Sequence, residues 1–141
     1  MSYDDQNIFA KILRNELPCI KVYEDELTLS FMDIMPQCDG HTLVIPKVSA
    51  VTLFDLPEEY YQACFQTMKK VGEALKIAFS TEGIMMFQLS GEQAGQTVPH
   101  LHLHLLPTSI VTLRTKKHAA VMEDQEKLNT FAKKIIAAMP A

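Results

Sequence analysis

The stretch Pro99-His100-Leu101-His102-Leu103-His104-Leu105-Leu106-Pro107 places three histidines at alternate positions. Successive side chains of a β-strand point to opposite faces, so the pattern predicts a strand with imidazoles on one face and leucines on the other. Burial of the leucine face would fix the register, because a slip by one residue would exchange the two faces. Imidazole, with an unperturbed pKa of about 6.5, suits nucleophilic, proton-transfer or metal-ligand chemistry near neutral pH.

Length and composition favour one domain over residues 1–141, because 141 residues with 48% hydrophobic content can bury one core and are too few for two ordinary domains. The chain has 13 basic and 17 acidic residues, which gives a net charge of -4 with neutral histidines. This balance disfavours nonspecific binding to nucleic acid or to a membrane surface. An anionic substrate would have to be held by local donors such as backbone N–H groups or imidazoles.

The three cysteines, Cys19, Cys38 and Cys64, are far apart and form no Cys-x-x-Cys pair. Their spacing predicts neither a disulfide framework nor a thiolate metal site, and it fits a reducing compartment. No stretch approaches the roughly 18 apolar residues of a membrane span, and the N-terminus lacks a basic segment that leads into an apolar one. We therefore expect a cytoplasmic protein without a membrane segment.

Hydrophobic periodicity and turn residues predict an α+β fold in which a helix opens at Asp55, with Glu58 completing a capping box. The core-facing stripe of this helix is expected to comprise Tyr61, Phe65, Met68, Leu75 and Phe79. Residues 108–118 are polar and basic with weak periodicity, so we predict no helix or strand there. The other expected elements are a helix at 7–17, a hairpin of 19–23 and 27–32, strands at 41–46 and 84–89, and a last helix from about 123.

A glycine-containing loop, residues 90–97, leads directly into the histidine strand. Gly91 and Gly95 alone indicate no more than turn residues. The segment Gly95-Gln96-Thr97-Val98 has a more informative position, because its backbone N–H groups could form an anion-binding concavity beside the imidazoles. The strand at 84–89 and the histidine strand are expected to pair antiparallel across this loop.

The motif His-Leu-His-Leu-His-Leu-Leu at 100–106 matches the His-φ-His-φ-His-φ-φ signature of the histidine triad superfamily, where φ is an apolar residue. The segments at 8–12, 31–34, 36–37, 40–47 and 94–98 are similar to those of the HINT branch, in the same order. The resemblance covers roughly residues 7–107 and leaves 108–141 as a C-terminal extension with a helix. It implies a sheet of about five antiparallel strands, with one long and one or two shorter helices, continued across a homodimer.

The resemblance also implies an activity, the hydrolysis or transfer of a purine nucleoside 5'-phosphoramidate, adenylate or related anhydride. His102 matches the nucleophile that attacks the α-phosphorus and forms a covalent nucleotidyl-histidine. His100 and His104 match phosphate-site histidines, and His41 matches a fourth. The same residues would work without a cofactor or a bound metal.

Nucleotide contacts are carried over in the same way. In the loop, Thr97 and Gln96 match residues that donate hydrogen bonds to the phosphate or leaving atom, flanked by Gly95 and Val98. Asp33 matches a carboxylate that accepts hydrogen bonds from both ribose hydroxyls, and core packing alone would leave that carboxylate without a partner. The apolar slot for the base would comprise Ile8, Phe9, Ile12 and Ile34, although core packing would account for these four residues equally well.

The chain departs from the family pattern at several positions. Leu89, followed by Ser90, stands where an Asn usually contacts the phosphate, and Ser49 stands where a histidine is common. Zinc-binding relatives carry cysteines where this chain has Asn7 and Ala10, which argues against a structural zinc site. After the triad, the segment at 106–109 resembles bacterial members.

Two alternatives remain open from the sequence. Three histidines on one face could instead ligate zinc with an open fourth position, although no carboxylate lies within the segment. A nucleotide-binding or scaffolding dimer with little turnover is the other alternative, and Leu89 is the residue that motivates it. The sequence leaves open the leaving group and the choice between adenine and guanine, because an apolar slot discriminates purines weakly.

Overall fold

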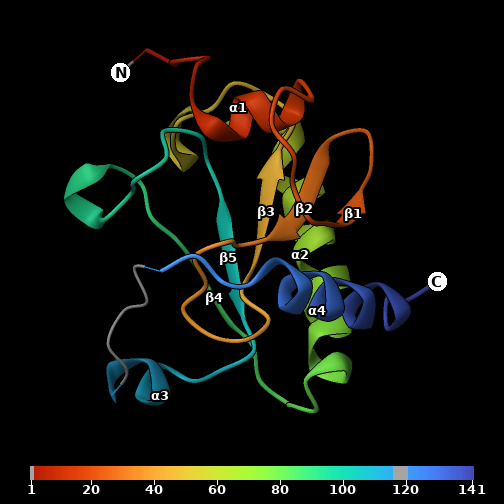
Figure 1. The fold of residues 1–141 in the computed structure, drawn as a ribbon. Coiled ribbons are helices and arrows are strands. Elements are labelled where there is room, and N and C mark those ends of the chain that lie inside the picture. The colour runs from red at the N-terminus through yellow and green to blue at the C-terminus, as the bar shows by residue number, and fades with distance from the viewer. Residues whose placement is uncertain (1, 116–120) are drawn as a thin grey trace.

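A five-stranded antiparallel sheet forms the centre of the computed structural model, which describes residues 2–115 and 121–141 (Figure 1). The strands lie in the order β1-β2-β3-β5-β4, and every neighbouring pair is antiparallel. The predicted α+β class is therefore confirmed. The strands are β1 (Lys21–Glu24), β2 (Thr28–Met32), β3 (Thr42–Pro46), β4 (Met85–Gln88) and β5 (Leu103–Leu106).

Helices cover the sheet unequally. The long helix α2 (Glu59–Ala78) and α4 (Gln125–Ala137) pack on each other and cover one face, with α4 crossing α2 (Figure 1). Helix α2 lies against β3 and β5, and α4 lies against β1 and β2, around a core that includes Val44, Leu103 and Leu105. The short helix α1 (Ile8–Leu13) packs Phe9 against the alternate side chains of β2 and β3. A fourth helix, α3 (Ile110–Thr115), lies at the periphery (Figure 1). None of the helices in the described residues is long and apolar enough to cross a membrane.

The histidine segment differs in two respects from the predicted strand. Regular pairing begins only at Leu103, so His100 and His102 precede β5. Leu103 and Leu105 enter the core beneath α2, as expected. The imidazole side is buried as well, with His100, His102 and His104 exposed by 0%, 7% and 8%, and Phe9 of α1 lies against the rings of His100 and His102.

The start of the long helix was predicted wrongly. Asp55 ends a 3-10 turn, Leu53–Asp55, in which it forms a capping box with Thr52 instead of Glu58. Leu56 has extended backbone angles, since the ring of the following Pro57 disfavours a helical conformation there. Helix α2 therefore begins at Glu59 without a side-chain cap.

The predicted stripe on that helix also needs correction. Tyr61 and Phe65 are exposed, by 47% and 67%, whereas Met68 and Leu75 are buried as expected. Residues that contact the sheet follow the spacing of the neighbouring helical row, which is Cys64, Met68, Val71 and Leu75. The two aromatic side chains thus remain on an open surface of α2.

The remaining expectations about elements held, with shorter bounds. The hairpin β1–β2, strands β3 and β4, helix α1 and helix α4 all form. Asp124 caps α4 through the backbone N–H of Lys127, and Leu128 and Ile135 are its buried side chains. Helix α3 was not predicted. Residues 116–118 of the polar segment lie outside the described residues.

The turn before β3 depends on a glycine. Gly40 has a φ of +86°, a conformation that L side chains rarely adopt. A Cβ there would lie 2.8 Å from ring atoms of Phe79 and Pro107, so a larger residue would meet strain and overlap together. The position matters for function because His41 follows directly.

We expect Gly40→Ala to lower the free energy of unfolding by about 2–4 kcal/mol, since positive φ and overpacking both oppose the new methyl group. Gly83→Ala is the matched control, because nothing lies within 4 Å of a Cβ at that position. Urea denaturation of the two variants measures both effects. Equal unfolding free energies for the two variants would contradict the account.

Candidate active site

A cavity of about 440 Å³ lies between α1, the end of β2 and the histidine segment. It brings together most of the predicted site residues, although they lie far apart in the sequence. The predicted residues that line it are Ile8, Phe9, Ile12, Asp33, Ile34, Gly95, Thr97, Val98, His102 and His104. His41, His100 and Gln96 do not line it and lie behind its wall, where they contact the lining residues or their backbone.

His102 is held so that one ring nitrogen remains free. Its Nδ1 lies 2.7 Å from the carbonyl oxygen of His100. A carbonyl can only accept, so Nδ1 carries the proton and Nε2 of the neutral ring keeps its lone pair. Burial lowers the pKa of His102 below its usual value. His102 therefore presents an unprotonated Nε2 at a cavity wall near neutral pH, as a nucleophile requires.

His100 is fixed behind His102 by two contacts. Its Nε2 donates to the carbonyl oxygen of Pro46, 3.0 Å away at the end of β3. Its Nδ1 consequently accepts, and the hydroxyl of Tyr3 lies 2.5 Å from it. Burial lowers the pKa of His100 to about 4, so the ring is neutral at pH 7.

His41 and His104 form a second anchored pair. The backbone N–H of Gln37 donates to Nδ1 of His41 at 3.0 Å, so the proton of this neutral ring is on Nε2. That Nε2 donates to Nδ1 of His104 at 2.9 Å, which leaves the proton of His104 on its own Nε2. Among the described residues, Nε2 of His104 is buried and has no hydrogen-bond partner. A ligand oxygen in the cavity could accept from it.

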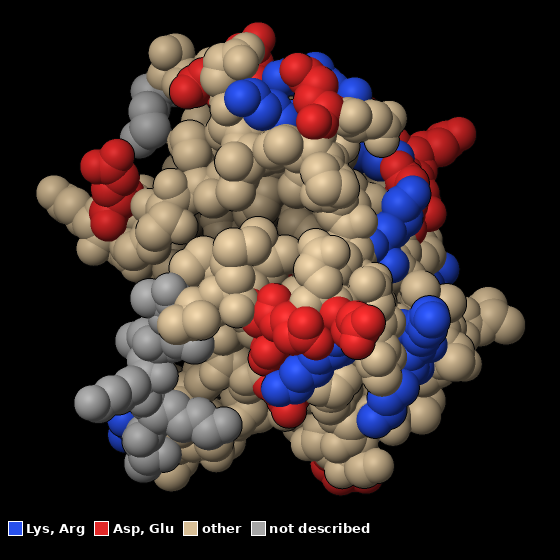
Figure 2. Space-filling model, in the orientation of Figure 1, with Lys and Arg blue, Asp and Glu red and all other residues tan. Residues whose placement is uncertain are grey.

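Burial keeps all four rings neutral. It lowers the pKa of His41 to about 4 and that of His104 to about 3, with a further contribution from the neighbouring His102. No lysine or arginine is among the described residues that line the cavity. On the face shown in Figure 2, basic and acidic side chains are interspersed and form no continuous basic patch. An anion in this cavity would be held by neutral N–H donors.

Asp33 stands at the end of β2 with its carboxyl at the cavity. It accepts from the backbone N–H of Met35 at 2.9 Å, and burial raises its pKa to about 6. Nε2 of His41 lies 3.5 Å from the other carboxyl oxygen. Because His41 is neutral, this contact is not an ion pair. Hydroxyl groups that donate hydrogen bonds to this carboxyl would stabilise its charged form and so lower its pKa again.

The loop before the triad is held by Gln96, whose side chain uses all its polar atoms locally. Its amide nitrogen donates to the carbonyls of Val51 and Val98, and its amide oxygen accepts from Gly91. The backbone N–H groups of Gly95 and Gln96 also bind carbonyls of the loop itself. The predicted anion concavity therefore cannot use these two N–H groups, and Thr97 is the hydroxyl-bearing loop residue that lines the cavity.

Leu89 also lines the cavity, at the position where relatives are expected to carry an Asn. The neighbouring Ser90 does not replace that amide, because it does not line the cavity; its hydroxyl oxygen accepts from the side chain of Gln88 and from the backbone N–H of Leu53. This part of the wall is therefore apolar. Sequence reasoning had left open whether Ser90 substitutes.

Several supporting residues were not predicted from the sequence. Phe87 of β4 stacks on His104, with ring centroids 4.3 Å apart, because strand pairing puts the two residues opposite each other. Gln37 sets the tautomer of His41, and Phe31 packs edge to face on Phe9. The strand alternation of residues 28–32 could have identified Phe31. The contact of Phe87 requires the sheet order, and that of Gln37 requires the conformation of the turn before His41.

The only group of potential metal ligands that the described residues bring together is Asp33, His41 and His104, whose ligand atoms lie within 4.8 Å of one another. The donor set does not fit a metal ion. A metal at Nε2 of His41 would require the proton on Nδ1, where the N–H of Gln37 already donates. Zinc bound through Nε2 of the triad rings meets a similar obstacle, because Nε2 of His100 donates to Pro46.

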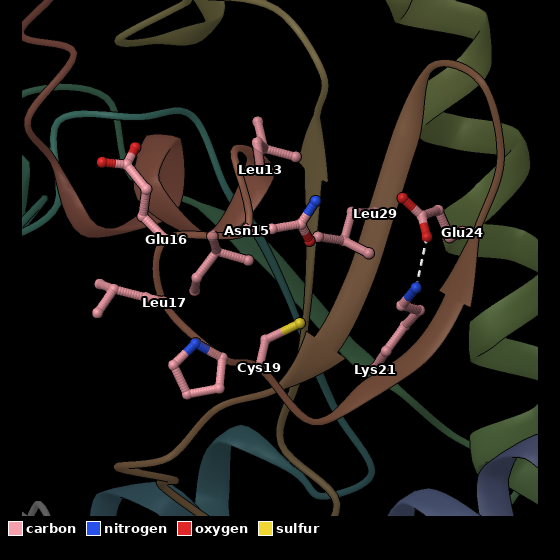
Figure 3. Close-up of a pocket in the computed structure, with 10 residues that line it drawn as sticks. Leu13, Asn15, Glu16, Leu17, Cys19, Lys21, Glu24 and Leu29 are labelled. Atoms are coloured by element: carbon pink, nitrogen blue, oxygen red, sulfur yellow. Dashed lines mark hydrogen bonds and ion pairs between the residues drawn. The ribbon is translucent and has the colours of Figure 1, made fainter.

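A second groove, of about 670 Å³, adjoins the cavity (Figure 3). Ile12, Pro18 and Cys19 line both spaces. The rest of this groove includes Asn15 and the ion pair between Lys21 and Glu24. None of the histidines in the described residues lines this groove. The two histidines that line a cavity, His102 and His104, belong to the first one.

Comparisons with known proteins agree with this fold. The sequence model of the HIT domain matches residues 14–111. Protein hit from Bacillus subtilis is 39% identical over 100 residues, which are 71% of this chain and 69% of that protein. Adenosine 5'-monophosphoramidase HNT1 from Saccharomyces cerevisiae is 31% identical over 136 residues, which are 92% of this chain and 80% of that protein. The crystal structure of a HIT-like protein from Bartonella henselae matches with a TM-score of 0.88 and 41% identity, over 98% of this chain and 100% of that one. The chain therefore belongs to the HIT family, the histidine triad proteins.

Proposed function

We propose that this protein hydrolyses purine nucleoside 5'-phosphoramidates, adenylates or related phosphoanhydrides through a covalent nucleotidyl-His102. The observation that carries the proposal is the neutral, carbonyl-anchored ring of His102, with its free Nε2 at the wall of the cavity. The Saccharomyces cerevisiae relative, which is named an adenosine 5'-monophosphoramidase, supports the substrate class.

In the first step, Nε2 of His102 attacks the α-phosphorus, an N–P bond forms, and the bond from phosphorus to the leaving nitrogen or oxygen breaks. The ring of His102 becomes positively charged, and the carbonyl of His100 stabilises that charge through the Nδ1–H. Nε2–H of His104 donates to a phosphoryl oxygen, which gives this atom its missing partner. The hydroxyl of Thr97 can donate a hydrogen bond to the leaving atom, and a leaving nitrogen takes up one proton from solvent as it departs. Water then attacks phosphorus and breaks the N–P bond, which releases the monophosphate and one proton to solvent and regenerates neutral His102.

The nucleoside is proposed to lie along the rest of the cavity. Asp33 accepts from the ribose hydroxyls, which compensates the burial of its carboxyl. The base lies in the apolar part of the cavity, against Phe9, Ile12 and Ile34. Donors that distinguish adenine from guanine are absent from these three side chains, so we expect weak discrimination between purines.

His102→Ala should abolish nucleotidyl transfer, with a loss on the order of 10³-fold or more, because no other residue supplies the nucleophile. Release of AMP from adenosine 5'-phosphoramidate, followed with a chelator present, measures the loss. The wild-type reaction should continue with chelator, and quenching in alkaline denaturant, in which the N–P bond is stable, should trap an enzyme that carries one nucleotidyl group. Wild-type rates in the variant, or wild-type activity lost on chelation, would contradict the mechanism.

A nucleotide-binding protein with little turnover is the second candidate, because Leu89 removes a polar group from the cavity wall. It predicts tight binding of AMP together with negligible release from phosphoramidates and adenylates. The assay above decides between the two candidates, since only the hydrolase accumulates nucleotidyl-enzyme.

The affinity for adenosine should depend on the protonation of Asp33. A carboxyl with a pKa of about 6 is charged above pH 6 and protonated below it. Because the ribose hydroxyls bind the charged form more strongly, affinity should be full above pH 6 and fall below it, by at most tenfold per pH unit. Adenosine is the probe because it carries no phosphate that titrates. Calorimetric titration between pH 5 and 8 measures the profile.

Asp33→Asn should bind adenosine roughly tenfold more weakly at pH 7.5 and lose this pH dependence. The control is Asp39→Asn, because Asp39 pairs with Lys127 outside the cavity. A similar acid-side loss in Asp33→Asn would assign the titration to another group.

We also propose that two copies associate through α2 and β4. β4 lies at an edge of the sheet, so one side of its backbone is available to pair with a second β4. Beside that edge, Phe54, Tyr61, Phe65 and Met86 form an exposed apolar surface, with Phe54 exposed by 88%. Apolar surface of this kind next to a free strand edge indicates a protein interface, and a second copy would extend the sheet.

Phe65→Glu should convert a dimer to a monomer, because the charge would be buried at the interface. Ile77→Glu is the matched control, since both side chains are 67% exposed and lie on the same helix, while Ile77 lies outside the surface. Light scattering after size-exclusion chromatography gives the mass. Dimers in both variants, or monomers in wild type, would contradict the proposal.

A further inference from the structure

We propose that Tyr3 is a positioning residue for the triad, whose hydroxyl fixes the ring of His100 and thereby the carbonyl that orients His102. The effect on turnover rests on the proposed function. Tyr3 precedes residues 14–111, which match the HIT domain, so this contribution comes from a part of the chain outside the matched region.

Tyr3 contacts the ring of His100 directly. Its hydroxyl lies 2.5 Å from Nδ1 of His100, and the two rings meet edge to face with centroids 5.6 Å apart. The direction of the hydrogen bond follows from the other ring nitrogen. Nε2 of His100 faces the Pro46 carbonyl and must donate, so Nδ1 of the neutral ring accepts and Tyr3 donates.

The segment that carries Tyr3 is itself fixed to α1. Asn7 caps α1 by accepting from the N–H of Ala10, and its amide donates to the carbonyl of Asp4. Arg14 donates to the carbonyl of Asp5. Phe9 of the same helix packs its ring against His100, with centroids 6.3 Å apart. The N-terminal segment and α1 therefore enclose His100 from two directions.

Two hydrogen bonds connect Tyr3 to His102 through His100, and a third anchors the His100 ring. Tyr3 donates to Nδ1 of His100, Nε2–H of His100 donates to the carbonyl of Pro46, and the carbonyl of His100 accepts from Nδ1–H of His102. Without the hydroxyl, Nδ1 of His100 is a buried acceptor with no donor, which favours a different ring state. Movement of this residue would displace the carbonyl that keeps Nε2 of His102 unprotonated.

Tyr3→Phe is the test, because it removes the hydroxyl and keeps the ring. We expect the single-turnover rate of nucleotidyl-His102 formation from adenosine 5'-phosphoramidate to fall about tenfold. KM should stay within about twofold, since Tyr3 does not line the cavity. The ¹⁵N NMR signals of the His100 and His102 rings should also change. Tyr60→Phe is the matched control and should alter none of these quantities.

The outcomes separate the positioning role from the proposed function. Unchanged ring signals together with an unchanged rate in Tyr3→Phe would overturn the inference, as would a rise in KM with the rate unchanged. If wild-type protein turned over none of the substrates, the proposed function would fail, and the NMR comparison alone would decide the role of Tyr3. Unaltered signals in that case would refute it, and altered signals would support it.

Discussion

The hydrogen bond from Nδ1–H of His102 to the carbonyl of His100 constrains the rest of the site. A side-chain acceptor could rotate or change protonation, whereas a backbone carbonyl does not change protonation, and this one is held by the bond from the adjoining N–H of Leu101 to the carbonyl of Ala50. The direction of the carbonyl depends on the anchoring of His100 to Pro46 and on the register of β5 against β3, which places His104 opposite Leu43. A slip of one residue would remove the nucleophile from the cavity and bury the wrong atoms in the core. The unprotonated state of Nε2 of His102 thus depends on the order and register of the central strands.

Burial gives the site its second property, neutrality. The pKa values of the four histidines are lowered because α1 and the loop at 89–98 exclude water from rings that strands β3 and β5 already shield. In the proposed reaction, such a site would bind the phosphate through oriented N–H groups instead of net positive charge. A monophosphate product carries more negative charge than its phosphoramidate or adenylate precursor, so a lysine in the cavity would favour the product. Neutral donors avoid that preference and can act mainly on charge that develops during the reaction.

The sequence predicted the parts of this arrangement that repeat locally. Alternation located the triad strand and its leucine face, and turn residues located the neighbouring strands. The sequence prediction was wrong at the start of α2, because the restriction imposed by Pro57 outweighed the capping pattern at Asp55. It was also wrong about the buried face of α2, which includes Cys64 instead of Phe65. It could not show that Gln96 uses its whole side chain inside the loop. The residues that contact the histidine rings could not be predicted because they are distant in the sequence. Tyr3 lies 97 residues from His100, and Phe87 contacts His104 only because β4 pairs with β5.

The unpartnered Nε2 of His104 connects stability to binding. Buried polar groups in native proteins nearly always have partners, because a buried donor without one costs about 1–3 kcal/mol. Here Phe87 stacks its ring on His104, while His41, which directly precedes β3, donates to the other nitrogen. This unpaired donor lowers the stability of the ligand-free protein, and an acceptor that enters the cavity would remove the penalty. Because the stacked ring and His41 hold the donor in place, little reorganisation accompanies binding. If the proposed function holds, the group that weakens the free protein strengthens the binding of a phosphoryl oxygen.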